Sequence, residues 1–161
     1  MSPGPTDLHH LSQAVLNHAA QHGVSLTVVR FPAGTRTAQQ AADAIGVALG
    51  AIVKSLVFMV ADAPWMVLVA GDRRVDEAKL QEQMQEPVRR ASADEVRRAT
   101  GAAIGGVAPF GHTMQLPTLV DTSLHRFPVV WAAAGTPDSV FALTPDQLKE
   151  LCHGQDWATE G

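Results

Sequence analysis

The chain has 161 residues, of which 46% are hydrophobic and 17% are charged, and its formal net charge is −4. This length suits one domain with a sizeable core, and no apolar run is long enough to cross a membrane. The acidic balance disfavours strong non-specific binding to nucleic acid. A single cysteine, Cys152, excludes an internal disulfide framework. Because residues 1–10 also lack the pattern of a signal peptide, a cytoplasmic location is expected.

The first half of the chain contains clear helix and strand signals. We expect a helix capped by Asp7 and ended by Gly23, then a strand at 24–31, a turn at 32–34 and a helix opened by the capping box of Thr37 and Gln40. The segments 52–61 and 65–70 are strongly apolar and are separated by Asp-Ala-Pro. This pattern predicts a hairpin of central strands.

The second half continues the alternation of helices and strands. The expected elements are helices at 76–85 and 92–101, a third helix opened by Thr144, and strands at 87–91, 119–121, 129–133 and 140–143, with a frayed tail at 154–161. Irregular alternation with hairpins predicts an α+β fold: one domain with a mixed sheet covered by helices.

The segment 102–111, Ala-Ala-Ile-Gly-Gly-Val-Ala-Pro-Phe-Gly, combines three glycines and a proline with no charge. Glycine lets a backbone approach a ligand closely, and proline fixes the local path. The segment therefore suits either a tight buried connection or a loop that presents main-chain groups to a ligand. His112 follows directly and is either within reach of such a ligand or an ordinary surface histidine.

Lys54 interrupts the apolar strand and shares a face with Leu56, Phe58 and Val60. A cation in phase with core residues must reach water, find a partner or lie in a cleft. In a cleft it would hold a phosphate or a polarised carbonyl oxygen.

Basic residues are concentrated between Arg73 and Arg98, but with Asp72 included the stretch holds as many Asp and Glu residues as Lys and Arg residues. Solvated helix faces are the simpler interpretation, and a basic surface for RNA phosphates is the alternative if the fold separates the signs. His18 and His22 have metal-ligand spacing without a third ligand. No nucleotide-binding or metal-binding motif is present, so no cofactor is expected.

The order of these motifs resembles the YbaK/ProX family, aminoacyl-tRNA editing domains related to the insertion domain of bacterial prolyl-tRNA synthetase. The resemblance covers about residues 24–152 of a single domain spanning 1–161. It is carried by Val-Lys-Ser-Leu-Val-Phe at 53–58, Gly-Asp-Arg-Arg-Val-Asp at 71–76, and Ile-Gly-Gly-Val-Ala-Pro-Phe-Gly at 104–111. It implies a mixed, curved sheet surrounded by helices.

The resemblance also implies a function: a free-standing hydrolase that cleaves the ester between a wrong amino acid and the 3′ end of tRNA. It implies catalytic roles for Lys54, Gly105 and Gly106. It further implies that substrate is bound by Val107, Ala108, Pro109, Gly111, His112, Ala133 and Gly135. Lys54 would anchor a phosphate or orient the ester, while loop main-chain groups stabilise the oxyanion.

The late turn carries Ala and Gly where other members of the family have His or Ser, so the amino acid removed stays open among Ala, Cys, Ser and Thr types. The expected partner is the 3′ end of aminoacyl-tRNA, delivered by prolyl-tRNA synthetase, another synthetase or an elongation factor, and no membrane is involved. The alternative to an enzyme is a non-catalytic module that binds tRNA ends or a synthetase.

Overall fold

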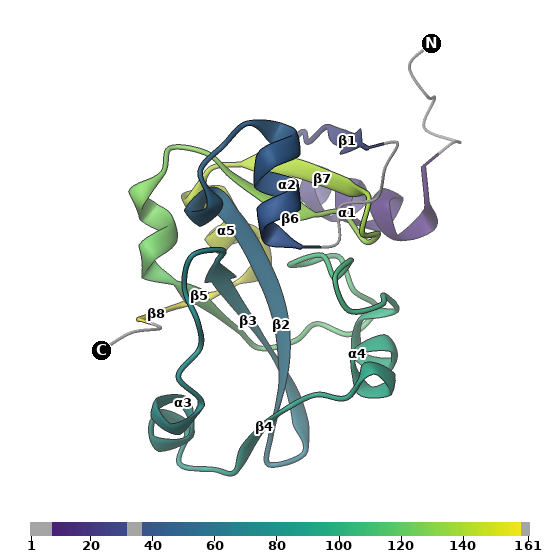
Figure 1. Cartoon of the computed structure of the whole chain (residues 1–161). Coiled ribbons are helices and arrows are strands. Elements are labelled where there is room, and N and C mark those ends of the chain that lie inside the picture. Colours follow the sequence, from purple (N-terminus) through teal and green to yellow (C-terminus); the bar gives the residue numbers. More distant parts are fainter. Residues whose placement is uncertain (1–7, 32–36, 159–161) are drawn as a thin grey trace.

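The computed structural model describes residues 8–31 and 37–158. Its elements in chain order are α1 (His10–Gln21), β1 (Val28–Arg30), α2 (Ala38–Ile45), the 3-10 helix η2 (Leu49–Ala51), β2 (Ile52–Val60), β3 (Ala63–Ala70), α3 (Glu77–Met84), β4 (Val88–Arg90), α4 (Ala93–Thr100), β5 (Thr118–Asp121), the 3-10 helix η3 (Thr122–Arg126), β6 (Val130–Ala133), β7 (Ser139–Leu143), α5 (Pro145–Cys152) and β8 (Gln155–Trp157). Within this described part, one sheet has the order β1-β7-β6-β2-β3-β5-β8, and β4 pairs with β2 (Figure 1). The expected α+β domain with a mixed sheet is confirmed.

The β2–β3 hairpin forms the centre of the sheet, as predicted. Its turn consists of Ala61 and Asp62, whose φ angles of 48° and 66° suit the tight turns that join antiparallel strands. The other edge of β2 is shared by two short partners. Parallel β6 pairs with residues 52–53, and antiparallel β4 pairs with residues 58–60. Among the described strands, none pairs with residues 54–57 on this edge.

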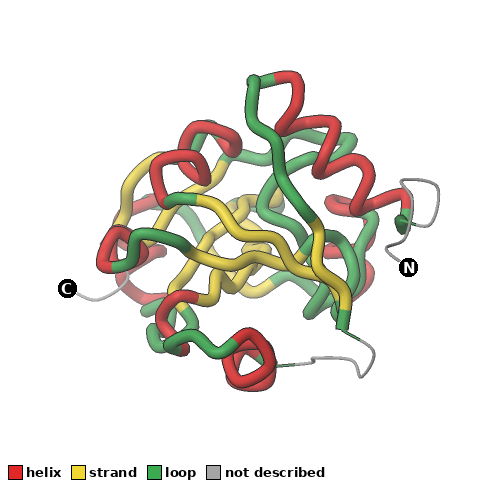
Figure 2. Tube along the Cα trace, turned by 90° about the horizontal axis from the view of Figure 1, so that it is seen from above, coloured by secondary structure: helices red, strands yellow, loops and turns green. Residues whose placement is uncertain are grey.

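Side chains on the two faces of the sheet pack into separate apolar clusters. The largest contains Val57, Leu68 and Phe141 together with residues of α1, α4 and α5. On the opposite face, Phe58, Val67 and Leu119 pack with α3 and β8, while α2 covers Ile52 in a third cluster. Helices therefore surround the sheet (Figure 2). None of the described helices is long and apolar enough to cross a bilayer.

Side-chain caps fix the starts of the helices as the sequence predicted. Thr37 with Gln40 opens α2, Ser92 with Glu95 opens α4, and Thr144 with Gln147 opens α5, each with both reciprocal hydrogen bonds of a capping box. Gly46 and Gly101 follow α2 and α4 in the left-handed conformation that ends a helix.

Three expectations differ from the structure or lie outside it. The N-cap of α1 is His9; Asp7 and the turn at 32–34 lie outside the described residues. The strand expected at 24–31 is only Val28–Arg30, because only these residues pair with β7. The tail expected to fray from residue 154 instead forms β8, which adds in parallel to β5 and buries Trp157.

Candidate functional site

A cavity of about 220 Å³ lies where β2 has no strand partner between β6 and β4. This volume is below the ~300–1,000 Å³ of sites for drug-sized ligands, so the cavity suits a small group. Its wall comes from the start of α2, the strands β2, β6 and β7, and the glycine-rich loop. The lining residues are Thr37, Ala38, Ala41, Ile52, Val53, Lys54, Ser55, Leu56, Ile104, Gly105, Val107, Trp131, Ala132, Ala133, Pro137, Ser139 and Val140.

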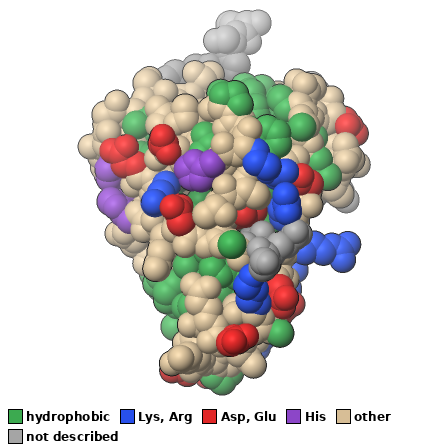
Figure 3. Space-filling model, turned by 90° about the vertical axis from the view of Figure 1, so that its left-hand side faces the viewer, with side chains coloured by type: hydrophobic (Ala, Val, Ile, Leu, Met, Phe, Trp, Pro, Cys, Tyr) green, Lys and Arg blue, Asp and Glu red, His purple; other side chains and the backbone are tan. Residues whose placement is uncertain are grey.

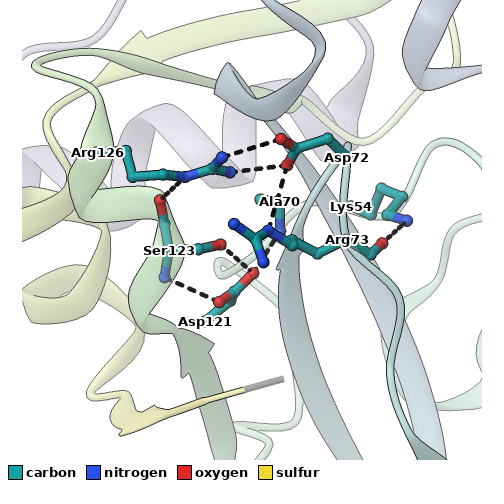
Figure 4. Close-up of polar contacts among 7 residues, drawn as sticks. All are labelled: Lys54, Ala70, Asp72, Arg73, Asp121, Ser123 and Arg126. Carbon is teal, nitrogen blue, oxygen red and sulfur yellow. Dashed lines mark hydrogen bonds and ion pairs between the residues drawn. The ribbon is translucent and has the colours of Figure 1, made fainter. Parts of the chain in front are cut away.

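Lys54 is the one charged side chain among these lining residues, and it is half-buried. Its Nζ donates a hydrogen bond of 2.6 Å to the main-chain oxygen of Arg73 (Figure 4). Burial lowers the pKa of the Lys54 ammonium, and the nearby charges of Arg74 and Arg90 lower that pKa further. An ammonium has three donors, so Lys54 keeps hydrogen atoms for a substrate.

Ser55 contributes a polar group that the sequence analysis did not single out. Its Oγ is buried at the cavity wall and has no hydrogen-bond partner among the described residues. The alternation of the β2–β3 ladder, in which the Ile52 oxygen bonds to Gly71, directs the main-chain groups of Ser55 to the unpaired edge. A serine directly after the lysine of an apolar strand is the signal that could have indicated it.

The glycine-rich loop forms the opposite wall through Ile104, Gly105 and Val107. Gly105 has a φ of 96°, which side-chain-bearing residues rarely adopt, and Ile104 is 62% exposed. Gly106 lies away from the cavity lining, and an added Cβ there would come within 2.9 Å of the main chain of Thr136. Gly106 therefore permits a close approach of the loop to the turn after β6.

Most of the remaining predicted site residues do not meet Lys54. Pro109, Gly111 and His112 line a second cavity of about 210 Å³ on the far side of the loop, next to His18. The Nε2 atom of His112 lies 2.8 Å from the Ala108 oxygen, and burial lowers the pKa of this imidazole. The loop thus belongs to two cavities.

The residues at the end of β6 and in the turn after it also lie in different places: some line the first cavity and others pack elsewhere. Ala133 lines the first cavity beside Trp131. Gly135, with a φ of 96°, lies against α1, where an added Cβ would come within 2.5 Å of the Cβ of Leu11. Ala108 is buried in the main core. The first cavity therefore gathers Lys54, Gly105, Val107 and Ala133 from the predicted set.

Two carboxylates near Lys54, those of Asp72 and Asp121, form hydrogen bonds or ion pairs with other residues (Figure 4). Asp121 is 1% exposed and accepts hydrogen bonds from the Ala70 N–H and from the N–H and hydroxyl of Ser123. Asp72 forms a two-bond ion pair with Arg126, which lowers the pKa of the Asp72 carboxyl. These contacts fix the segment that follows β3, whose Arg73 oxygen holds Lys54.

Other candidate chemistries find no support in this part of the chain. Across residues 8–31 and 37–158, no three His, Cys, Asp or Glu side chains lie together as metal ligands. His18, whose Nε2 lies 2.6 Å from the Leu151 oxygen, packs on Phe110. Burial raises the pKa of the Cys152 thiol to about 12, so a nucleophilic thiolate is disfavoured at neutral pH.

Solved structures and curated proteins resemble this chain over most of its length. A structure of a protein provisionally described as a trans-editing enzyme for prolyl tRNA synthetase is 42% identical, with a TM-score of 0.90, and the match covers 96% of this chain and 100% of that one. The uncharacterised protein YwhH of Bacillus subtilis (strain 168) is 36% identical over 146 residues, which are 90% of this chain and 93% of YwhH.

Larger proteins contain a related segment. The proline–tRNA ligase of Lactobacillus gasseri is 38% identical over 87 residues, which are 53% of this chain but only 15% of the ligase. The sequence model of the protein family described as the aminoacyl-tRNA editing domain matches residues 32–151 of this chain. The match includes every residue of β2, the glycine-rich loop and the turn after β6. On this match, the chain belongs to the aminoacyl-tRNA editing domain family.

Proposed function

We propose that the protein is a free-standing trans-editing deacylase, which hydrolyses the ester of mischarged tRNA. The observation that carries the proposal is the small cavity at the unpaired edge of β2, in which Lys54 and the glycine-rich loop face a common space. The resemblance to a provisional trans-editing enzyme over nearly the whole chain supports the same activity.

In the proposed reaction, water attacks the ester carbonyl carbon, and a negative charge develops on the carbonyl oxygen. The bond from that carbon to the ribose oxygen then breaks, the ribose oxygen takes a proton, and free amino acid and uncharged tRNA result. An aminoacyl ester is already activated, so the protein has mainly to orient water and stabilise charge. Lys54 offers a cation that orients the ester, and the Ser55 Oγ offers a polar contact for water or substrate.

The cavity also suggests which amino acids are removed. Its wall is apolar apart from Thr37, Lys54, Ser55 and Ser139, and Trp131 and Val140 reduce the space available. Small side chains of the Ala, Cys, Ser or Thr type fit this volume. Because Ser55 has an unpartnered oxygen, the wall can accept a hydroxyl as well as a methyl group.

A deacylation screen tests the proposed function. Purified protein is incubated with tRNAs charged with Ala, Cys, Ser or Thr, and the amino acid and the tRNA body are varied separately. We expect turnover of at least one mischarged tRNA, and a loss of about 100-fold in the Lys54→Ala variant, as for removal of one oxyanion donor. Absence of turnover across the whole panel would overturn the proposal.

The second candidate is a non-catalytic module that binds a tRNA end or a synthetase, which the similarity to part of proline–tRNA ligase favours. It predicts retained binding to tRNA in Lys54→Ala and no hydrolysis by the unaltered protein. The same panel, read by both release and binding, distinguishes the two functions.

A further inference from the structure

The turn after β6 brings three polar side chains together at one end of the first cavity. The hydroxyl of Thr136 donates a hydrogen bond of 2.7 Å to the carboxylate of Asp138. The hydroxyl oxygens of Thr136 and Ser139 lie 2.5 Å apart. Ser139 is 2% exposed and is the one of these three residues that lines the cavity. Its hydroxyl is therefore the point at which this network can meet a ligand.

The direction of these hydrogen bonds follows from the number of hydrogen atoms available. A carboxylate only accepts, and a threonine hydroxyl carries one hydrogen, so Thr136 uses its hydrogen on Asp138. Ser139 is then the donor in its contact with the Thr136 hydroxyl. The second contact of the Ser139 hydroxyl, to the main-chain oxygen of Thr136 at 3.4 Å, also uses the serine hydrogen. Ser139 therefore has only acceptor lone pairs left for the cavity.

The two other hydroxyls of the cavity wall differ from that of Ser139. The Thr37 hydroxyl accepts a hydrogen bond from the Gln40 N–H, and this bond does not use the threonine hydrogen. The Ser55 hydroxyl has no partner among the described residues. Both can donate to a ligand, whereas Ser139 can only accept.

Lys54 and Ser139 lie on opposite sides of the end of β6. Lys54 follows the residue that pairs with Ala132, and Ser139 precedes the residue that pairs with Ala133. Because β6 separates β2 from β7, the two side chains belong to strands on the order of 10 Å apart. Figure 3 shows a face of the molecule on which basic and acidic side chains are mixed. The cavity instead separates its polar groups, with a cation at one end and an acceptor at the other.

An aminoacyl ester carries polar groups that match this arrangement. Its carbonyl oxygen accepts hydrogen bonds, and the α-ammonium group on the next carbon donates them and is positively charged. A positive group is repelled by Lys54, so the end of the cavity with the acceptor favours it.

We propose that Ser139 binds the α-ammonium group of the substrate while Lys54 faces the ester carbonyl. Thr136 and Asp138 are positioning residues, because they fix the Ser139 hydroxyl as an acceptor. This inference rests on the proposed function and names the substrate class of that site: aminoacyl esters with a free α-amino group, as opposed to simple acyl esters.

Binding of two non-hydrolysable analogues tests the contact without requiring catalysis. One is adenosine with an alanyl group joined to its 3′ position by an amide, and the other carries propionyl, which has hydrogen in place of the α-ammonium. Calorimetric titration of the full chain gives the Kd of each. We expect the alanyl analogue to bind about tenfold more tightly, as for one hydrogen bond to a charged group. Ser139→Ala should remove this preference, and equal Kd values or no binding of the alanyl analogue to the unaltered protein would overturn the proposal.

Variants of Thr136 separate recognition from folding. Thr136→Val keeps the shape of the side chain but removes the hydroxyl that takes the Ser139 hydrogen. We expect the preference for the alanyl analogue to fall at least threefold in Thr136→Val and to be restored in Thr136→Ser, which keeps the hydroxyl. Thermal unfolding of each variant confirms that it is folded at the temperature of the titration.

Ser12→Ala is the matched control. The Ser12 hydroxyl is also 2% exposed and donates a hydrogen bond of 2.6 Å to the Ala134 oxygen beside the same turn, but Ser12 lies outside the cavity lining. Its loss should leave the preference for the alanyl analogue unchanged. Equal loss of preference in Ser12→Ala and Ser139→Ala would overturn the contact, because a disturbed turn would then explain both.

Hydrolysis of the matching esters separates this inference from the proposed function. With tRNA that carries alanyl or propionyl, and with spontaneous hydrolysis subtracted, Ser139→Ala should lower kcat/KM about tenfold for the alanyl ester only. If the unaltered protein hydrolyses neither ester but prefers the alanyl analogue through Ser139, the proposed function fails and the α-ammonium site stands. If Ser139→Ala affects both esters equally, the hydrolase stands and the α-ammonium site fails.

Discussion

At the scale of single residues, Ser55 combines a buried hydroxyl with the absence of a partner among the described residues. Removing an unpartnered hydroxyl breaks no hydrogen bond, so Ser55→Ala should keep the free energy of unfolding within ~0.5 kcal/mol. If the Oγ binds water or substrate, kcat should fall about tenfold. Urea unfolding and deacylation measured on the same preparation give both quantities.

Ser123→Ala is the control for that change. The Ser123 hydroxyl donates to Asp121 at 2.7 Å, outside the cavity lining. Its loss should destabilise the protein by ~1 kcal/mol, because a buried carboxylate loses a donor. A Ser55→Ala protein that is destabilised but fully active would show that Ser55 has only a structural role.

The pKa of the Lys54 ammonium should depend on the charges around it. Burial and the charges of Arg74 and Arg90 lower the pKa of the ammonium, so its charge is lost at a lower pH than the ordinary 10.5. Replacing Arg90 by Gln removes a repulsive charge and should move the pKa upwards. Titration of the Lys54 Cε by NMR measures this pKa directly. Arg89→Gln is the control: Arg89 forms a two-bond ion pair with Glu95, so its loss should leave the Lys54 pKa unchanged. A downward shift in Arg90→Gln would contradict the arrangement.

At the scale of elements, the glycines of the glycine-rich loop are needed for different structural reasons. Gly106 approaches the main chain of Thr136 too closely for a Cβ. Gly106→Ala should therefore shift the loop and lower both stability, by ~1–3 kcal/mol, and activity. Ile104→Ala, at a 62% exposed position of the same loop, should leave stability unchanged. Thermal unfolding of the two variants measures the difference, and equal midpoints would contradict the packing role of Gly106.

The elements whose signals are local could be predicted from the sequence. Thr37, Ser92 and Thr144 cap their helices through contacts three residues away, so their motifs are sufficient. The division of the loop between two cavities could not be predicted, because it depends on the packing of Gly111 against α1 and of Gly106 against the late turn. Such contacts join segments that lie far apart in the chain.

At the scale of the whole molecule, the cavity lies where two short strands, β6 and β4, each pair with a different part of one edge of β2. Parallel β6 pairs only with Ile52 and Val53, and β4 pairs only with residues 58–60, so none of the described strands pairs with the interval between them on this edge. Lys54, which lies in this interval, could be singled out from the sequence as a candidate site residue, but the interval itself could not. Strand partners separated by many residues are set by the tertiary fold, and no local pattern of β2 encodes them.

The far edge of the sheet depends on Trp157, which is 4% exposed and packs in the cluster of Phe58 and Leu119. The position of this segment at the end of the chain favoured a frayed tail, whereas the burial of Trp157 accompanies its pairing with β5. Trp157→Ala should therefore reduce the free energy of unfolding by ~3–5 kcal/mol. Urea denaturation measures this loss, and Gln155→Ala, exposed on the same strand, should change it by less than ~0.5 kcal/mol.

Trp157→Phe separates packing from hydrogen bonding at this position. Within the described residues no acceptor meets the buried indole Nε1, so the unaltered protein already carries the cost of an unpartnered donor. Phenylalanine removes that donor but keeps most of the ring, so its loss of stability should be much smaller than that of Trp157→Ala. Equal destabilisation by Phe and Ala would show that the indole nitrogen, rather than the ring, holds the strand.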